Sequence, residues 1–85
     1  MTPELQRIFM TAAHVMTAKG LRRGERPFAT KVMLQIFMRH EMPSSADVEA
    51  IDRICDRVLA GMPSRLAAFV LAERKARKAL MEGQQ

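Results

Sequence analysis

Residues 27–41 read PFATKVMLQIFMRHE, and their pattern decides the fold that we predict. The proline stands at the start of the run, where a missing N–H is tolerated and the fixed φ suits the first turn of a helix. Apolar side chains then cover most of the helix circumference and leave a narrow polar strip of Lys31, Gln35 and Arg39. A helix that is apolar nearly all round is buried on several sides. We therefore expect other helices, and part of a partner, to surround it.

The same punctuation predicts three further helices. Each begins at or near a proline, and glycines fall where the periodic runs end. Thr2 and Ser44 stand where their hydroxyls can cap the first and third helices. The predicted helices span residues 3–19, 27–41, 45–60 and 63–82. The expected fold is therefore all-α, a compact bundle of four helices in a single domain, residues 1–85, that self-associates.

Apolar spacing assigns an inward face to each of the other helices. In the first helix, apolar residues recur three and four positions apart from Leu5 to Met16, whereas Thr11 and His14 project from the opposite side. The third helix has one apolar face and a charged outer face in the same way. In the fourth helix, only the apolar first half, residues 66–72, is expected to pack deeply.

The composition is that of a folded chain. Hydrophobic residues make up 48% of the 85 residues and charged residues 27%, a balance that disordered tails lack. No apolar run approaches the roughly 20 residues that span a bilayer. The chain begins Met1-Thr2-Pro3-Glu4, with no basic region ahead of an apolar stretch. We therefore expect a cytoplasmic protein with no membrane partner.

Cys55, His14 and His40 are the side chains best suited to nucleophilic or metal chemistry, and none has a partner at the required spacing. Cys55 lies on the apolar face of its helix, where a thiol behaves as a small hydrophobe. Gly20 and Gly24 lack the lysine and the hydroxyl of a phosphate-binding loop. We therefore expect no enzyme activity, no catalytic residue, no metal, no cofactor and no small-molecule substrate.

Apolar side chains beyond the needs of one small core predict a partner-binding surface. Met10, Met38 and Met81 fall off the inward stripes, and flexible methionines suit adaptable interfaces. Small residues along the fourth helix would let another helix approach closely. The alternative is that the helix over residues 27–41 is simply the central helix of the bundle. The predicted partner-binding residues are Met10, Leu34, Met38, Ala68, Ala72, Ala76 and Met81.

The net charge of +5 is unevenly placed along the chain. One basic group surrounds the first connection, a second lies late in the fourth helix, and residues 41–57 carry five acids against two bases. Basic groups attract nucleic acid, and a second copy could set its acidic helix against them. The alternative is that the late basic residues only complement the helix dipole. The candidate nucleic-acid-binding residues are Lys19, Arg22, Arg23, Arg26, Lys31, Arg74, Lys75, Arg77 and Lys78.

The sequence fits a bihelical DNA-reading motif poorly, because the motif would bury Lys19 and Arg26, or Asp56 and Arg57. Our first hypothesis is a small regulatory, adaptor or inhibitor protein that binds another protein, and a second copy of itself, through helical surfaces. One alternative is a nucleic-acid-binding regulator that uses residues 19–31 and the basic part of the fourth helix. The other is a subunit or assembly chaperone of a larger complex.

Overall fold

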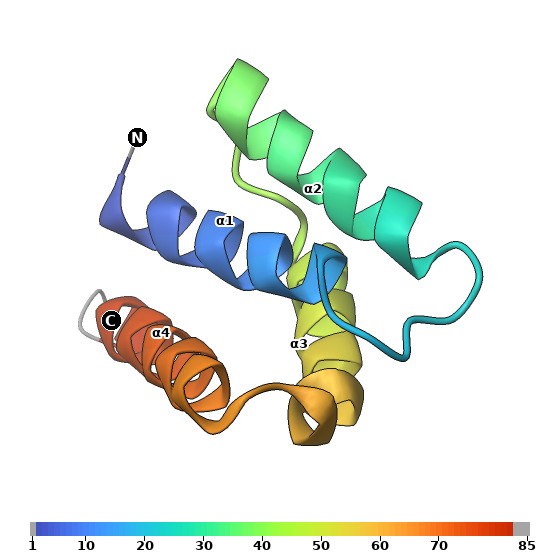
Figure 1. Ribbon diagram of the computed structural model, residues 1–85. Helices are drawn as coiled ribbons and strands as arrows, with labels where there is room; N and C mark the ends of the chain where they lie inside the picture. Colours follow the sequence, from blue (N-terminus) through green and yellow to red (C-terminus); the bar gives the residue numbers. More distant parts are fainter. Residues whose placement is uncertain (1, 83–85) are drawn as a thin grey trace.

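The computed structural model describes residues 2–82, with side chains for residues 2–80, and every regular element in this range is helical. Figure 1 shows the elements, which are α1 (Pro3–Met16), α2 (Glu25–Arg39), α3 (Ser45–Val58), the short 3₁₀ turn η1 (Leu59–Gly61) and α4 (Ser64–Glu82). The prediction of an all-α bundle of four helices is therefore confirmed. None of the described helices is both long enough and apolar enough to cross a membrane.

The helix at the centre of the bundle is α1. It lies between α2 and α4, and α3 crosses near its C-terminal end (Figure 1). The second helix, α2, packs mainly on α1 and touches α3 only lightly, so it lies at the edge of the bundle. The interpretation of the helix over residues 27–41 as the central helix is therefore wrong, because α1 takes that position.

The core forms where the inward faces of the four helices meet. Its side chains recur three and four positions apart on each helix, which is the spacing that keeps them on one face. The apolar faces predicted for the first and third helices are confirmed by their burial. The most deeply buried apolar side chains are Ile8, Ala12, Val15, Ala29, Val32, Ile36, Ile51, Cys55 and Val70.

The central position of α1 also buries its second side, which the sequence assigned to solvent. Thr11 is only 1% exposed, and its hydroxyl donates to the Arg7 carbonyl at 3.0 Å. His14 is half-buried, and its ring meets Phe69 of α4 edge to face, with centroids 5.4 Å apart. The prediction of a single buried face on this helix is therefore wrong. Thr11 tolerates burial because its own helix satisfies the hydroxyl.

Burial on α4 also differs from the prediction. Among its described side chains Val70 is the only buried apolar one, whereas Phe69 and Leu71 are 43% and 47% exposed. The other buried side chain of this helix is Arg77, in the half that was predicted to be solvated. Deep packing within residues 66–72 is therefore confined to Val70, with Leu66 packed partly against the core. The helix α4 contacts the bundle through polar as well as apolar groups.

The helix ends follow the predicted caps with small shifts. The Thr2 hydroxyl accepts from the Leu5 N–H and the Ser44 hydroxyl from the Asp47 N–H, both at 3.2 Å, which confirms both caps. The first helix ends at Met16, three residues early, and Thr17 bonds back to the carbonyls of its last turn. The second starts at Glu25, two residues early, because Gly24 adopts a positive φ of 88° immediately before it.

Candidate interaction surfaces

The side of α2 that faces away from the bundle carries large apolar side chains. Leu34, Phe37 and Met38 are 50%, 62% and 71% exposed, and we call these three residues the α2 outer face. The core contacts of the same helix come from the opposite side, at Ala29, Val32 and Ile36. The prediction that this helix is buried on several sides is therefore wrong for the chain by itself, and its surplus apolar surface lies in solvent.

Basic residues border the α2 outer face. Arg26, Lys31 and Arg39 are exposed and line, together with Leu34 and Met38, one open hollow on the outside of the helix. No acidic side chain is among the described residues that line this hollow. The Arg26 Nε atom donates to the Met16 carbonyl at 3.1 Å, which holds that side chain beside the end of α1. The surface is therefore apolar at its middle and positive at its margins.

Phe37 is a member of this surface that was not among the predicted partner-binding residues. Its ring lies 6.3 Å from that of Phe9 on α1, centroid to centroid, at a tilt of 33°. The contact anchors one edge of the ring while most of the side chain stays in solvent. The available signal was spacing, since Phe37 lies one turn from Leu34 and next to Met38, both of which were predicted partner residues.

The predicted partner-binding residues fall in three separate places. Leu34 and Met38 belong to the α2 outer face. Met10 is half-buried and lines a small hollow between α1 and α4. The small-residue stripe lies along α4, where Ala68 and Ala72 are exposed and Ala76 is half-buried, and the side chain of Met81 lies outside the described residues. The structure therefore does not join these residues into one surface.

The basic residues of α4 are divided between solvent and the bundle. Lys75 and Lys78 are exposed. Arg77 is only 3% exposed, and its Nη2 atom lies 2.5 Å from Asp52 Oδ2 on α3. Arg74 donates to Asp56 Oδ1 at 2.5 Å, and its Nε atom lies 3.3 Å from Asp52 Oδ1.

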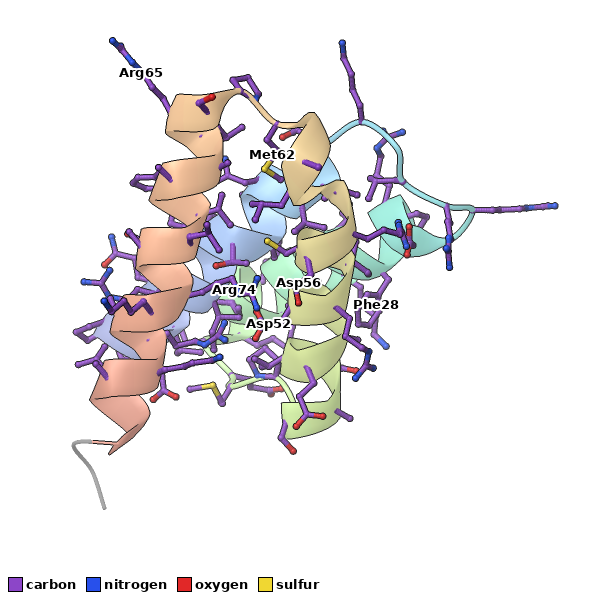
Figure 2. The ribbon with its side chains drawn as sticks, turned by 90° about the horizontal axis from the view of Figure 1, so that it is seen from below. Phe28, Asp52, Asp56, Met62, Arg65 and Arg74 are labelled. Atoms are coloured by element: carbon purple, nitrogen blue, oxygen red, sulfur yellow. The ribbon has the colours of Figure 1, made fainter. Side chains whose placement is uncertain are left out.

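These ion pairs fasten α4 to α3. Figure 2 shows Arg74, Asp52 and Asp56 together in the space between the two helices. Arg74 and Arg77 pair with aspartates inside the protein. We therefore no longer count them as candidate nucleic-acid-binding residues. The same pairs neutralise Asp52 and Asp56, two of the acidic residues of α3 that we expected a second copy of the chain to use.

The basic residues of the first connection lie in solvent. Lys19, Arg22, Arg23, Arg26 and Lys31 are all exposed. In the view of Figure 2, the connection between α1 and α2 stands out from the helices with extended side chains. Lys19, Arg22, Arg23 and Arg26 line one depression and form one accessible region. Lys31 lies on α2 and lines the hollow of the α2 outer face instead.

A second hollow lies between this connection and α3. Arg22 and Arg23 line it from the connection, and Arg53 and Arg57 line it from α3. We call it the arginine hollow; its other lining residues are Gly24, Glu25, Phe28, Ala50 and Ile54. Arg53 was not among the predicted nucleic-acid-binding residues, because the sequence gave no signal that α3 packs beside residues 22–24.

One ion pair crosses the arginine hollow and ties the connection to α3. The Arg57 guanidinium binds the Glu25 carboxylate through two nitrogens, with Nη1 donating to Oε2 at 2.8 Å. The Arg22 backbone N–H donates to the same carboxylate. The hydrogen bond from Arg57 is the main reason why the pKa of Glu25 falls to about 2, and the Arg22 N–H adds to this effect against the opposing effect of desolvation.

Cys55 is fully buried among core side chains, as its apolar helix face predicts. Burial raises the pKa of the thiol, and the Arg74 guanidinium only partly opposes this shift. A raised pKa keeps the thiol protonated and weakly nucleophilic. Within residues 2–80, no group of three or more histidine, cysteine and acidic side chains is arranged to hold a metal ion.

Comparison with known proteins does not assign the chain to a family. No family model, curated protein or solved structure matches it. The α2 outer face and the arginine hollow are therefore the two features from which we argue function.

Proposed function

We propose that this protein is a small regulatory or adaptor protein that docks on another protein through the α2 outer face. The supporting observation is the exposure of Leu34, Phe37 and Met38, each half or more in solvent, on three adjacent positions of one helix face. Contiguous exposed apolar side chains with a polar margin are typical of protein interfaces. In this role the chain acts by occupying a site on its partner, as an inhibitor or an adaptor does.

The charges around this surface favour an amphipathic helix with acidic residues as the occupant. From Pro27 to Met38, α2 extends about 16 Å, which matches roughly three turns of a partner helix. Such a helix would set apolar side chains against Leu34 and Met38. Its acidic residues would meet Arg26 and Lys31 at one end and Arg39 at the other.

A second copy of the chain is a weaker candidate for the same surface. In a two-fold dimer built on α2, the border of one copy would meet the identical border of the other. Arg26, Lys31 and Arg39 would then face like charges, which is unfavourable. Two other forms of protein binding remain proposals. One is self-association through the exposed face of α4, and the other is membership of a larger complex.

The test is affinity capture from the native host followed by quantitative mass spectrometry. We expect a partner that the wild-type chain retains and that the double variant Leu34→Ser/Met38→Ser loses. The matched control is Leu71→Ser/Ala72→Ser, which makes two substitutions at exposed positions of α4. Circular dichroism should show all three proteins folded. Retention of the same proteins by both variants would refute docking through α2.

Light scattering of the purified chain distinguishes the second copy from a foreign partner. A dimer that Leu34→Ser/Met38→Ser dissociates would assign the α2 outer face to self-association. A dimer that only Leu71→Ser/Ala72→Ser dissociates would assign self-association to α4 and leave the α2 outer face for another protein.

A further inference from the structure

The arginine hollow has a basic lining, which suits an anionic group of a ligand, and an apolar lining, which suits an apolar or aromatic group. Four arginines line it, Arg22, Arg23, Arg53 and Arg57. Its apolar lining comes from Phe28 at the start of α2 and from Ala50 and Ile54 on α3. The volume of the hollow, about 670 Å³, is within the range of ligand sites in proteins.

Three of the four guanidinium groups are available to a ligand. Arg57 and Glu25 satisfy each other across the hollow. Arg22, Arg23 and Arg53 are exposed, and within the described residues none of them forms an ion pair. Guanidinium groups bind phosphate oxygens through paired hydrogen bonds, so a cluster of three favours a ligand with several phosphates.

The basic surface continues beyond the hollow along the first connection. Lys19 and Arg26 line the adjoining depression together with Arg22 and Arg23. A ligand seated in the hollow would therefore meet further positive charge beside it, which a chain of phosphates can use and a single phosphate cannot.

Phe28, which packs partly against the core and also lines the hollow, favours one form of nucleic acid over another. It is half-buried and lies on the opposite side of α3 from α4 (Figure 2), where its side chain lines the hollow. Bases of a single strand expose their faces and stack on aromatic or apolar side chains, whereas a duplex keeps those faces inside its own stack. Phosphate-binding arginines beside an apolar lining therefore fit a single strand.

We propose that the arginine hollow binds single-stranded nucleic acid, with phosphates on Arg22, Arg23 and Arg53 and a base against Phe28. This site is distinct from the α2 outer face, so either proposal can fail without the other. Glu25 shapes the site by holding Arg57 and the Arg22 backbone in place while its own charge is neutralised.

Fluorescence anisotropy with labelled single strands of fifteen thymidines or fifteen uridines, of roughly the length an extended site covers, tests the proposal. The variant Arg22→Ala/Arg23→Ala/Arg53→Ala should bind at least about tenfold more weakly than wild type at low salt. The slope of log affinity against log salt should fall by about 2, the value for three lost phosphate contacts on a single strand. The comparison variant is Arg65→Ala/Lys75→Ala/Lys78→Ala, which removes three exposed charges from α4, including the other exposed nucleic-acid-binding candidates Lys75 and Lys78. If the site is the arginine hollow and not α4, this variant should change affinity less than about threefold.

A second variant tests the contribution of the ring. Phe28→Leu keeps an apolar side chain and all charges, and it should weaken single-strand binding about fivefold or more while leaving any binding of polyglutamate unchanged. Circular dichroism confirms that each variant is folded.

Three results would overturn the proposal. The first is no binding of either strand at low salt, and the second is an equal loss in the α4 control. The third is binding of duplex DNA or polyglutamate as tight as that of the single strands, with no effect of Phe28→Leu. That result would assign the hollow to polyanions in general.

Discussion

Arg77 of α4 is a buried cation that faces an acidic residue of α3. Its exposed fraction is 3%, and both of its terminal nitrogens face the Asp52 carboxylate. A buried charge is tolerated only when it is paired, because its hydration is lost on folding. The pair therefore makes Asp52 a structural requirement of the chain.

Asp52→Ala tests this requirement. We expect the free energy of unfolding to fall by about 3 kcal/mol, because the variant leaves Arg77 buried without its counter-charge. The measurement is urea unfolding followed by circular dichroism, with Glu49→Ala on the exposed side of α3 as the control, which should change stability by less than about 0.5 kcal/mol. Recovery of stability in Asp52→Ala/Arg77→Met would confirm the cause, and a loss below about 1 kcal/mol would contradict it.

Glu25 gives a second prediction at the scale of single residues, as a dependence on pH. Its pKa in the folded protein is about 2, below the ordinary value of 4.5, chiefly because Arg57 binds the ionised carboxylate. Its contribution to stability is therefore complete above about pH 4.5 and disappears as the pH falls towards 2.

The comparison is between wild type and Glu25→Gln, with the free energy of unfolding measured by urea titration at several pH values. Wild type should be the more stable protein at pH 7, and the difference should shrink between about pH 4.5 and pH 2. A difference that does not change with pH would show that the carboxylate charge contributes nothing through Arg57.

Among the elements, α2 shows how one helix serves both the core and a surface. Ala29, Val32 and Ile36 follow the helical spacing and face α1, whereas Leu34 and Met38 share the opposite side. The sequence pattern contains both faces without saying which is covered, because nearly all of the circumference is apolar. The packing of α2 on α1, with only a light contact to α3, made that choice.

Paired substitutions on α2 test the assignment of its two faces. Ile36→Ala should lower the free energy of unfolding by about 2 to 5 kcal/mol, since it removes a fully buried side chain from the core. Leu34→Ala, two residues away and 50% exposed, should cost less than about 1 kcal/mol. Equal losses in thermal or urea unfolding would mean that the outer face is covered in the isolated chain.

At the scale of the whole molecule, the two proposed binding surfaces adjoin without coinciding. The α2 outer face and the arginine hollow are lined by different residues, the first by the middle of α2 and the second by the first connection and α3. Basic residues border both surfaces. Two acidic residues of α3, Asp52 and Asp56, instead form ion pairs with Arg74 of α4.

The sequence by itself determined the number, order and approximate limits of the helices. Prolines, glycines, capping hydroxyls and apolar spacing act over one or two turns of the chain, and the helices at Pro3, Glu25, Ser45 and Ser64 follow from them. The inward face of α3 was equally predictable, because its polar and apolar sides are sharply divided.

Only the tertiary structure decided which helix is central and which charges are free. Thr11 is buried because α1 lies between two helices, and Arg77 is buried because α3 supplies an acid opposite it. Arg53 joins Arg22 and Arg23 because α3 packs beside the first connection. Each outcome depends on contacts between residues far apart in the chain, whereas helical periodicity records only neighbours within a few turns.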